Sequence, residues 1–151
     1  MANTYSSLYF HVVFSTKLRQ RWISQEFEQD VWDEIGSIVK GIGCQPIKIG
    51  GIEDHIHSLM RVPPKIAPSE AVQKMKSNSP RAIHQKFGKL RIFAWQDGYS
   101  IFSVSKSIVP QVVKYIETQR IHHESLSYED EYLELLRLHE IDLVDEKYVF
   151  G

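Results

Sequence analysis

The sequence predicts an α+β fold with an antiparallel sheet, and three observations lead to this class. Short runs of apolar and β-branched residues alternate with longer segments of helical periodicity along the 151 residues. Two of the short runs, residues 46–52 and 56–62, are separated only by a Glu53-Asp54 step, which is typical of a hairpin. The chain contains no repeat, low-complexity tract or long linker. We therefore expect residues 1–151 to form a single domain.

The first strand and the first helix have clear local signals. Residues 8–14 form an apolar run rich in β-branched and aromatic side chains, as in a buried strand. Residues 26–39 carry apolar side chains at helical spacing. We expect Ser24 to be the N-cap of this helix, and Gly41 and Gly43 to end it.

The second half of the chain supplies the remaining helices and the fourth strand. After a proline-rich break, residues 69–87 are expected to form a helix that Pro80 interrupts or kinks. Residues 101–104 alternate apolar and small side chains, as a fourth strand would. A third helix is expected at residues 107–123, and residues 128–138 carry leucines and a tyrosine at helical spacing.

The predicted order β-α-β-β-α-β-α-α is that of the split βαβ, or ferredoxin-like, arrangement. In this arrangement two helices pack on one face of an antiparallel sheet. The extra C-terminal helix, which carries Tyr115, is an addition to that core. Binding modules, metal carriers and nucleases share this fold, so the fold alone leaves the function open.

Composition bounds the compartment and the class of partner. Cys44 is the only cysteine, which excludes an internal disulfide and a cysteine-rich zinc site and favours the reducing cytoplasm. No apolar run approaches the ~20 residues that span a bilayer, so we expect no membrane partner. Residues 1–122 hold 16 basic and 10 acidic side chains, whereas residues 123–151 hold 2 and 9. This asymmetry indicates either a polyanion-binding surface with an acidic tail at roughly 124–151, or an ordinary charged surface. The tail is expected to pack on its own domain or on a partner subunit.

The basic residues concentrate in the middle of the chain. Residues 61–91 hold eight basic side chains and one acidic side chain. Within the predicted second helix, Lys74, Lys76, Arg81 and Lys86 are candidate contacts for DNA phosphates. The alternative is a solvated helix face.

His55-Ile56-His57 in the predicted third strand is a candidate metal site. Residues i and i+2 of a strand point to the same face, so both imidazoles emerge together while Ile56 packs on the other face. Two nitrogens at this spacing can hold a divalent metal, but a third ligand has to come from elsewhere. The alternative is a pair of histidines with no ligand role.

The third helix places a phenol and a carboxamide side by side. Tyr115, Gln119 and His122 follow i, i+4, i+7 spacing beside the apolar stripe of the helix. The Gln119 oxygen suits a hard cation such as Mg²⁺ or Mn²⁺, and the Tyr115 oxygen is a candidate nucleophile. The alternative is a half-buried aromatic ring with polar neighbours. His123 and Glu117 are expected on the surface.

The two patterns together fit phosphodiester chemistry. A metal held by His55, His57 and Gln119 would neutralise the charge that develops on a phosphate group in the transition state. Tyr115 could then displace one sugar oxygen and keep the phosphoryl group as an ester, which conserves the bond for later rejoining. An ordinary hydrolase has no need of such a tyrosine.

These residues resemble those of a known family. His55-Ile56-His57 resembles the HUH motif (His, hydrophobic, His) of metal-dependent single-strand nucleases. Residues 93–105 and 113–123 are similar to the later blocks of the small single-tyrosine HUH transposases of bacterial insertion sequences. The resemblance spans nearly the whole chain and keeps the order of the blocks.

The resemblance implies a metal-dependent transposase that cuts and rejoins single-stranded DNA at the hairpin-bearing ends of a mobile element, through a 5′-phosphotyrosine. It implies that His55, His57 and Gln119 are metal ligands and that Tyr115 is the nucleophile. It also implies a homodimer in which the tyrosine helix of one subunit can complete the site of the other. Two alternatives stay open: a domesticated relative that binds hairpins without transposing, and a metal-binding or interaction protein of the same fold.

Five other side chains have two interpretations each. Tyr99 is a rival nucleophile or a packed loop aromatic, and Trp95 either stacks on a base or anchors the core. His11 is a core histidine or one that approaches the site. Asp54 is an acceptor that orients one histidine, or a simple turn residue. His122 is open to a role in proton transfer or DNA contact.

Overall fold

A computed structural model describes residues 3–141 and confirms the predicted α+β class. The four strands lie in the order β2-β3-β1-β4, and every neighbouring pair is antiparallel. In chain order, the strands and α-helices are β1 (Tyr9–Ser15), α1 (Glu28–Ile42), β2 (Gln45–Ile52), β3 (His55–Arg61), α2 (Pro68–Lys86), β4 (Ser100–Val104), α3 (Val109–Glu117), α4 (Gln119–His122) and α5 (Tyr128–Leu138).

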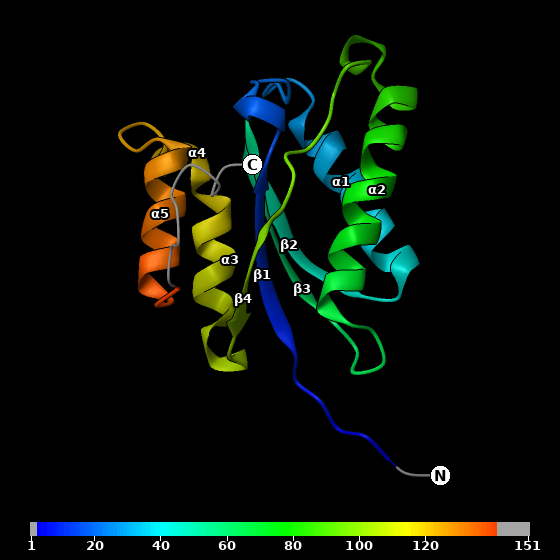
Figure 1. Ribbon diagram of the computed structural model, residues 1–151, viewed down its shortest axis with the longest axis vertical. Coiled ribbons are helices and arrows are strands. Elements are labelled where there is room, and N and C mark those ends of the chain that lie inside the picture. Colours follow the sequence, from blue (N-terminus) through cyan, green and yellow to red (C-terminus); the bar gives the residue numbers. More distant parts are fainter. Residues whose placement is uncertain (1–2, 142–151) are drawn as a thin grey trace.

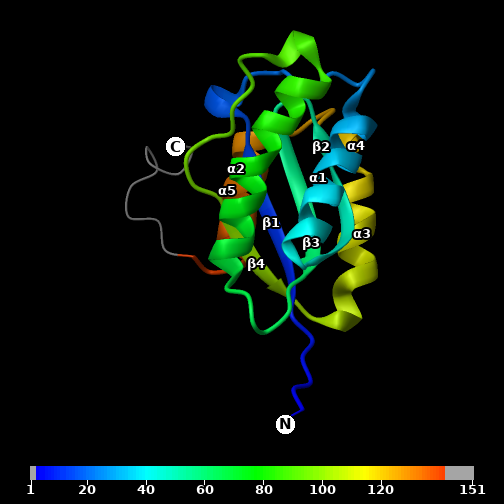
Figure 2. The same ribbon diagram turned by 90° about the vertical axis from the view of Figure 1, so that its right-hand side faces the viewer.

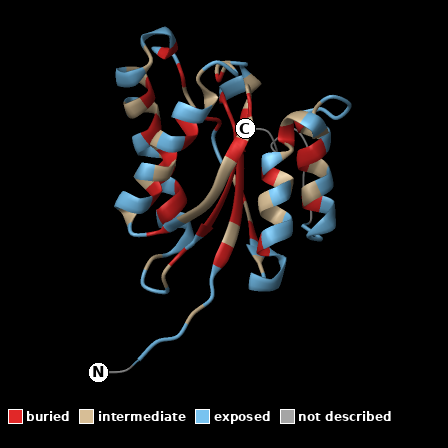
Figure 3. Ribbon diagram, turned by 180° about the vertical axis from the view of Figure 1, so that it is seen from behind, coloured by how far each residue is buried: buried red, intermediate tan, exposed pale blue. Residues whose placement is uncertain are grey.

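The helices divide between the two faces of the sheet. α1 and α2 cover one face, as the split βαβ arrangement requires, and α3, α4 and α5 lie on the opposite face (Figures 1 and 2). Buried residues follow the strands and the sides of the helices that face them (Figure 3). Across residues 3–141, none of the helices is both long and apolar enough to cross a membrane.

The main core lies between the sheet and the pair α1 and α2. Alternate residues of β1 and β3, among them Phe14 and Ile56, pack into it with no exposed surface. Trp95 belongs to the same core: its indole N–H donates to the Ser79 hydroxyl at 2.7 Å, and its ring meets those of Phe14 and Phe93 edge-on. The structure therefore places Trp95 as a core anchor.

A smaller cluster attaches α5 to the other face of the sheet. Tyr128, Tyr132 and Leu136 of α5 pack against Val13 of β1 and Phe102 of β4. The described part of the acidic tail thus packs on its own domain. Its remainder, residues 142–151, lies outside the described residues.

The start of α1 differs from the expectation, whereas its end at Gly43 agrees with it. α1 begins at Glu28, so the prediction of Ser24 as its N-cap is wrong; Ser24 lies in a turn in which its carbonyl accepts from the Phe27 N–H. Gly43, with φ of 101°, ends the helix because a left-handed residue is needed there, and Gly41 lies inside α1. α2 continues through Pro80 to Lys86.

The predicted third helix is broken at Thr118. Its backbone leaves the helical region (φ −103°, ψ 20°), and the chain continues as the separate turn α4. The Thr118 hydroxyl donates to the Lys114 carbonyl at 2.9 Å, one turn back in α3. Such back-bonding competes with regular helix geometry and commonly bends a helix.

The close approach of α3 to β2 at Gly50 predicts a stability effect. A Cβ atom at Gly50 would lie 2.9 Å from Ile116 Cγ2 and 3.2 Å from the Ile116 carbonyl oxygen. We therefore expect Gly50→Ala to push α3 away from the sheet and to lower the free energy of unfolding by about 1–3 kcal/mol. Urea denaturation measures this change. The matched control is Gly41→Ala, because a Cβ there has no neighbour within 4 Å and alanine is the better helix former. Equal stability of wild type and Gly50→Ala would contradict the close contact.

Candidate active site

β3 places both histidines of the motif on the face that α3, α4 and α5 cover. His55 and His57 have no exposed surface, and Ile56 between them belongs to the main core on the other face. The alternation expected from the sequence is therefore confirmed. The two imidazole rings lie 5.1 Å apart between centroids.

The tyrosine helix meets these histidines within one chain. Gln119 is 1% exposed, and its Oε1 lies 2.9 Å from His55 Nε2. The Tyr115 ring lies 5.6 Å from the His57 ring between centroids. The structure thus brings together all four residues expected from the sequence to carry the chemistry.

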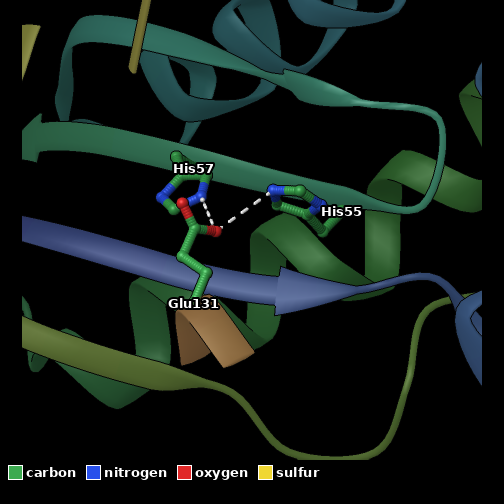
Figure 4. A group of neighbouring side chains, drawn as sticks. All are labelled: His55, His57 and Glu131. Atoms are coloured by element: carbon green, nitrogen blue, oxygen red, sulfur yellow. Dashed lines mark hydrogen bonds and ion pairs between the residues drawn. The ribbon is translucent and has the colours of Figure 1, made fainter. Parts of the chain in front are cut away.

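Glu131 of α5 is a site residue that the sequence analysis missed. Its Oε1 lies 3.1 Å from His57 Nε2 and 3.4 Å from His55 Nε2, so the carboxylate projects from α5 onto both histidines of β3 (Figure 4). Its Oε2 accepts hydrogen bonds from the Tyr115 hydroxyl and, at 3.0 Å, from the Gln119 amide. Glu131 is 2% exposed. One ligand atom from each of His55, His57 and Glu131 lies within 4.8 Å of the others, so the three could hold a metal ion.

The sequence does contain a signal for Glu131. Helical spacing places it three residues after Tyr128 and four before Leu135, on the apolar side of the segment. A carboxylate on a buried stripe needs a partner, because acidic residues are almost never fully buried unpaired. The neighbouring acids Glu129 and Asp130 hide this signal, since acids in the first turn of a helix are ordinarily explained by the helix dipole.

Each histidine of the motif is also held at its second ring nitrogen. Asp54 Oδ1 lies 2.8 Å from His55 Nδ1, and His11 Nε2 lies 2.8 Å from His57 Nδ1. Asp54 therefore orients a histidine, and His11 is both a buried histidine and a neighbour of the site. With both Nδ1 atoms engaged, the two Nε2 atoms face Glu131.

His123 is part of the site, and the expectation that it lies on the surface is wrong. Its side chain is 4% exposed, and its Nε2 lies 3.2 Å from Glu131 Oε1 and 3.1 Å from Gln119 Oε1. It follows Gln119 by four residues, and this spacing could have identified it. His122 instead lies beside Tyr115, with 4.9 Å between ring centroids.

The electrostatics of the site follow from burial and from the shared carboxylate. Burial by itself lowers the pKa of His55, but its hydrogen bonds to Asp54 and Glu131 outweigh burial and raise that pKa to about 9. Burial alone would raise the pKa of Glu131, yet the hydrogen bonds from three histidines hold it far below its usual range. Burial and the adjacent carboxylate raise the pKa of Tyr115 well above its usual value, so its phenol keeps its proton in this arrangement.

The converging atoms fit a divalent cation. When the Nδ1–H of His55 is directed to Asp54, the neutral ring presents an Nε2 lone pair to Gln119 Oε1 and Glu131 Oε1. A positive charge has to lie among these atoms, either as a proton on the ring or as a metal ion. Imidazole nitrogens together with amide and carboxylate oxygens accommodate Mg²⁺, Mn²⁺ and several transition metals.

Other tyrosine and acid candidates lie away from this group. Tyr99 packs against the main core, on the face of the sheet opposite the histidines. The interpretation of Tyr99 as a packed loop aromatic is therefore the one that the structure favours. Glu117 is exposed, as expected, and lies 3.5 Å from the Lys48 ammonium.

The four basic candidates lie on α2, across the sheet from Tyr115 (Figure 1). Lys74 and Lys86 are exposed and form ion pairs with acids of α2 and α1. Arg81 is exposed. Lys76 differs, because its ammonium donates to two carbonyls of the loop before β4, one of them at 2.8 Å.

Comparisons with known proteins identify transposases that are similar to this chain. A curated relative from Deinococcus radiodurans, the ISDra2 transposase TnpA, is 26% identical over 117 residues, which cover 74% of this chain and 84% of the relative. The transposase for insertion sequence element IS200 of Salmonella typhimurium is 28% identical over 129 residues, covering 79% of this chain and 81% of the relative.

Two solved structures share the fold. The crystal structure of a Deinococcus radiodurans protein described as a transposase has a TM-score of 0.64 at 22% identity, covering 79% of this chain and 96% of that one. A REP-associated tyrosine transposase, solved bound to a REP hairpin, has a TM-score of 0.58 at 13% identity, covering 83% and 76%.

The family assignment follows from a match over most of the chain. The sequence model of the family described as IS200-like transposases matches residues 4–119, which include both histidines of the motif, Tyr115 and Gln119. This chain belongs to the IS200-like transposase family.

Proposed function

We propose that this protein cleaves and rejoins single-stranded DNA at the ends of a mobile element through a covalent 5′-phosphotyrosine on Tyr115. One observation carries the proposal: Tyr115 at the end of α3 and Gln119 at the start of α4 meet the paired histidines of β3. A phenol at a cation site is suited to making a phosphate ester rather than to simple hydrolysis.

In this proposal His55, His57 and Gln119 hold the divalent metal. When bound, Mg²⁺ or Mn²⁺ would polarise a phosphate oxygen and stabilise the charge of the transition state. Asp54 and His11 fix the ring orientations of the two histidines. Such supporting contacts commonly determine how well a ligand set binds its ion.

The proposed step exchanges one phosphate ester for another. The Tyr115 oxygen forms a bond to phosphorus, and the bond between phosphorus and the 3′ oxygen of the upstream nucleotide breaks. The phenol loses one proton and the departing 3′ oxygen gains one. Because one phosphate ester replaces another, the step needs no external energy source. Attack by another 3′-hydroxyl reverses the step and rejoins a strand.

DNA recognition is proposed to involve hairpins and the exposed basic residues of α2. A structural neighbour was solved bound to a REP hairpin, which supports hairpin DNA as the substrate class. Lys74, Arg81 and Lys86 are exposed, so phosphates could approach them from solvent. We assign Lys76 to holding the loop before β4, because its ammonium already contacts carbonyls there. The cytoplasmic location expected from the single cysteine stays a prediction.

Replacing the nucleophile tests the proposal directly. We expect the wild-type protein with Mn²⁺ to form a covalent adduct with a pool of 3′-labelled single strands that carry hairpins. Tyr115→Phe should form none, because phenylalanine lacks the attacking oxygen. A denaturing gel measures the adduct. Tyr99→Phe, on the other face of the sheet, should form as much as wild type.

The outcomes of this experiment separate the two nucleic-acid functions. Hairpin binding by the wild type without any adduct would support a domesticated binding module instead. An adduct that persists in Tyr115→Phe would assign the nucleophile to another residue.

Removal of a proposed ligand should weaken metal binding. We expect His57→Ala to lower the affinity for Mn²⁺ by at least about tenfold and to lose the adduct, because the alanine offers no nitrogen ligand. Isothermal titration calorimetry measures the affinity. His84→Ala is the control, since His84 lies on α2 and contacts the Phe93 carbonyl. Equal Mn²⁺ affinity of the two variants would exclude His57 as a ligand.

Mixing two inactive variants tests whether the site is completed between subunits. The homodimer and the exchange of tyrosine helices implied by the resemblance stay predictions, while in the described structure one chain supplies every group. We therefore expect micromolar mixtures of Tyr115→Phe and His57→Ala to form no adduct. Restored adduct formation in the mixture, measured on the same gel, would support completion in trans.

A further inference from the structure

We propose that Glu131 is a positioning residue that sets the orientation of both Tyr115 and Gln119. The inference rests on the function proposed above and assigns a catalytic support role to α5. Glu131 lies beyond residues 4–119, the segment that the family model matches. The contact between Glu131 and His57 joins residues 74 positions apart, which no local pattern encodes.

Glu131 determines which end of the Gln119 amide faces the histidines. A carboxylate only accepts hydrogen bonds, so the NH₂ end of the amide has to face Glu131. Gln119 Nε2 donates to Glu131 Oε2 at 3.0 Å, and Gln119 Oε1 then lies 2.9 Å from His55 Nε2. A flipped amide would set two oxygens against each other at Glu131. Glu131 thereby makes Gln119 an oxygen ligand.

Glu131 also holds the hydroxyl of the proposed nucleophile, Tyr115. Tyr115 donates to the same Oε2, while Oε1 of that carboxylate faces His57 at 3.1 Å and His55 at 3.4 Å. One rigid carboxylate therefore spans the phenol oxygen and the histidine nitrogens. It fixes the phenol oxygen beside the cation site, where a positional error of about 1 Å can lower a rate a hundredfold.

Glu131 itself is held in place by its surroundings. The carboxylate is 2% exposed, so water does not compete for its oxygens. His123, the residue that follows α4, supports the carboxylate with its Nε2 at 3.2 Å from Oε1. Ser127 caps α5 by accepting from the Asp130 N–H at 3.1 Å, and Tyr132 packs the helix onto the sheet. The carboxylate is thus fixed from both sides.

The test compares Glu131→Gln and Glu131→Ala with Asp130→Asn. Asp130 lies in the same turn and is exposed, so Asp130→Asn makes the same charge change as Glu131→Gln without touching the site. An amide at position 131 has one oxygen and cannot accept on both sides at once. We expect both Glu131 variants to bind Mn²⁺ about 10- to 100-fold more weakly and to form the adduct about 10- to 100-fold more slowly. Their affinity for the hairpin strands should stay within about twofold of wild type, a split that a loss of folding would not produce.

A measurement without metal or DNA reads the amide orientation. In ¹⁵N-labelled protein, the NH₂ signal of Gln119 should move in Glu131→Gln and stay in place in Asp130→Asn. Rates and Mn²⁺ affinities of the Glu131 variants equal to those of Asp130→Asn would overturn the proposal. So would a faster adduct, because the carboxylate would then be blocking the phosphate. If wild type forms no adduct at Tyr115, the proposed function fails, whereas the amide signal and the Mn²⁺ affinity still test Glu131.

Discussion

The C-terminal half of the structure is organised around one buried charge, the carboxylate of Glu131. Burying an ionised carboxylate without partners costs several kcal/mol of free energy. α5 can therefore pack on the sheet only where hydrogen-bond donors face Glu131. His55 and His57 supply those donors from β3, and Tyr115 supplies another from α3. The reverse holds as well, because the ring nitrogens of buried imidazoles need hydrogen-bond partners. Docking of α5 and assembly of the site are therefore one event.

The parts of the site that the sequence predicted obey local rules. Strand alternation sets His55 and His57 on one face, and helical spacing sets Tyr115 beside Gln119, whatever the rest of the chain does. Glu131 obeys no such rule, since its partners are chosen by how α5 packs across the sheet. Helical spacing does place His123 beside Gln119, four residues earlier. The spacing does not indicate, however, which side of a polar helix is buried.

The fold was predictable because its strands and helices also follow local rules of sequence. The errors in the fold prediction concern single side chains that end or bend helices. The strands follow from apolar runs, and the pairing of β2 with β3 follows from the short connection between them; both signals are robust to one-residue errors. Helix ends depend instead on one competing hydrogen bond each, such as the Thr118 hydroxyl on the Lys114 carbonyl. The two faces of the sheet have different roles. The main core beside α1 and α2 holds Tyr99 and Trp95, and the opposite face holds Tyr115 with the buried polar group.

The tyrosine helix can complete the site of its own subunit or that of a partner. Which of the two prevails depends on the effective concentration of the helix at each site rather than on the contacts it makes. An exchanged helix would make the same contacts as the resident one, including Gly50 against Ile116 and Arg120 against Glu28 and Glu53. Those contacts therefore cancel in the comparison. A short connection holds the resident helix at an effective concentration of order millimolar, against micromolar for a separate subunit. A thousandfold advantage corresponds to about 4 kcal/mol, and this is the free energy that a dimer interface would have to add before exchange could prevail.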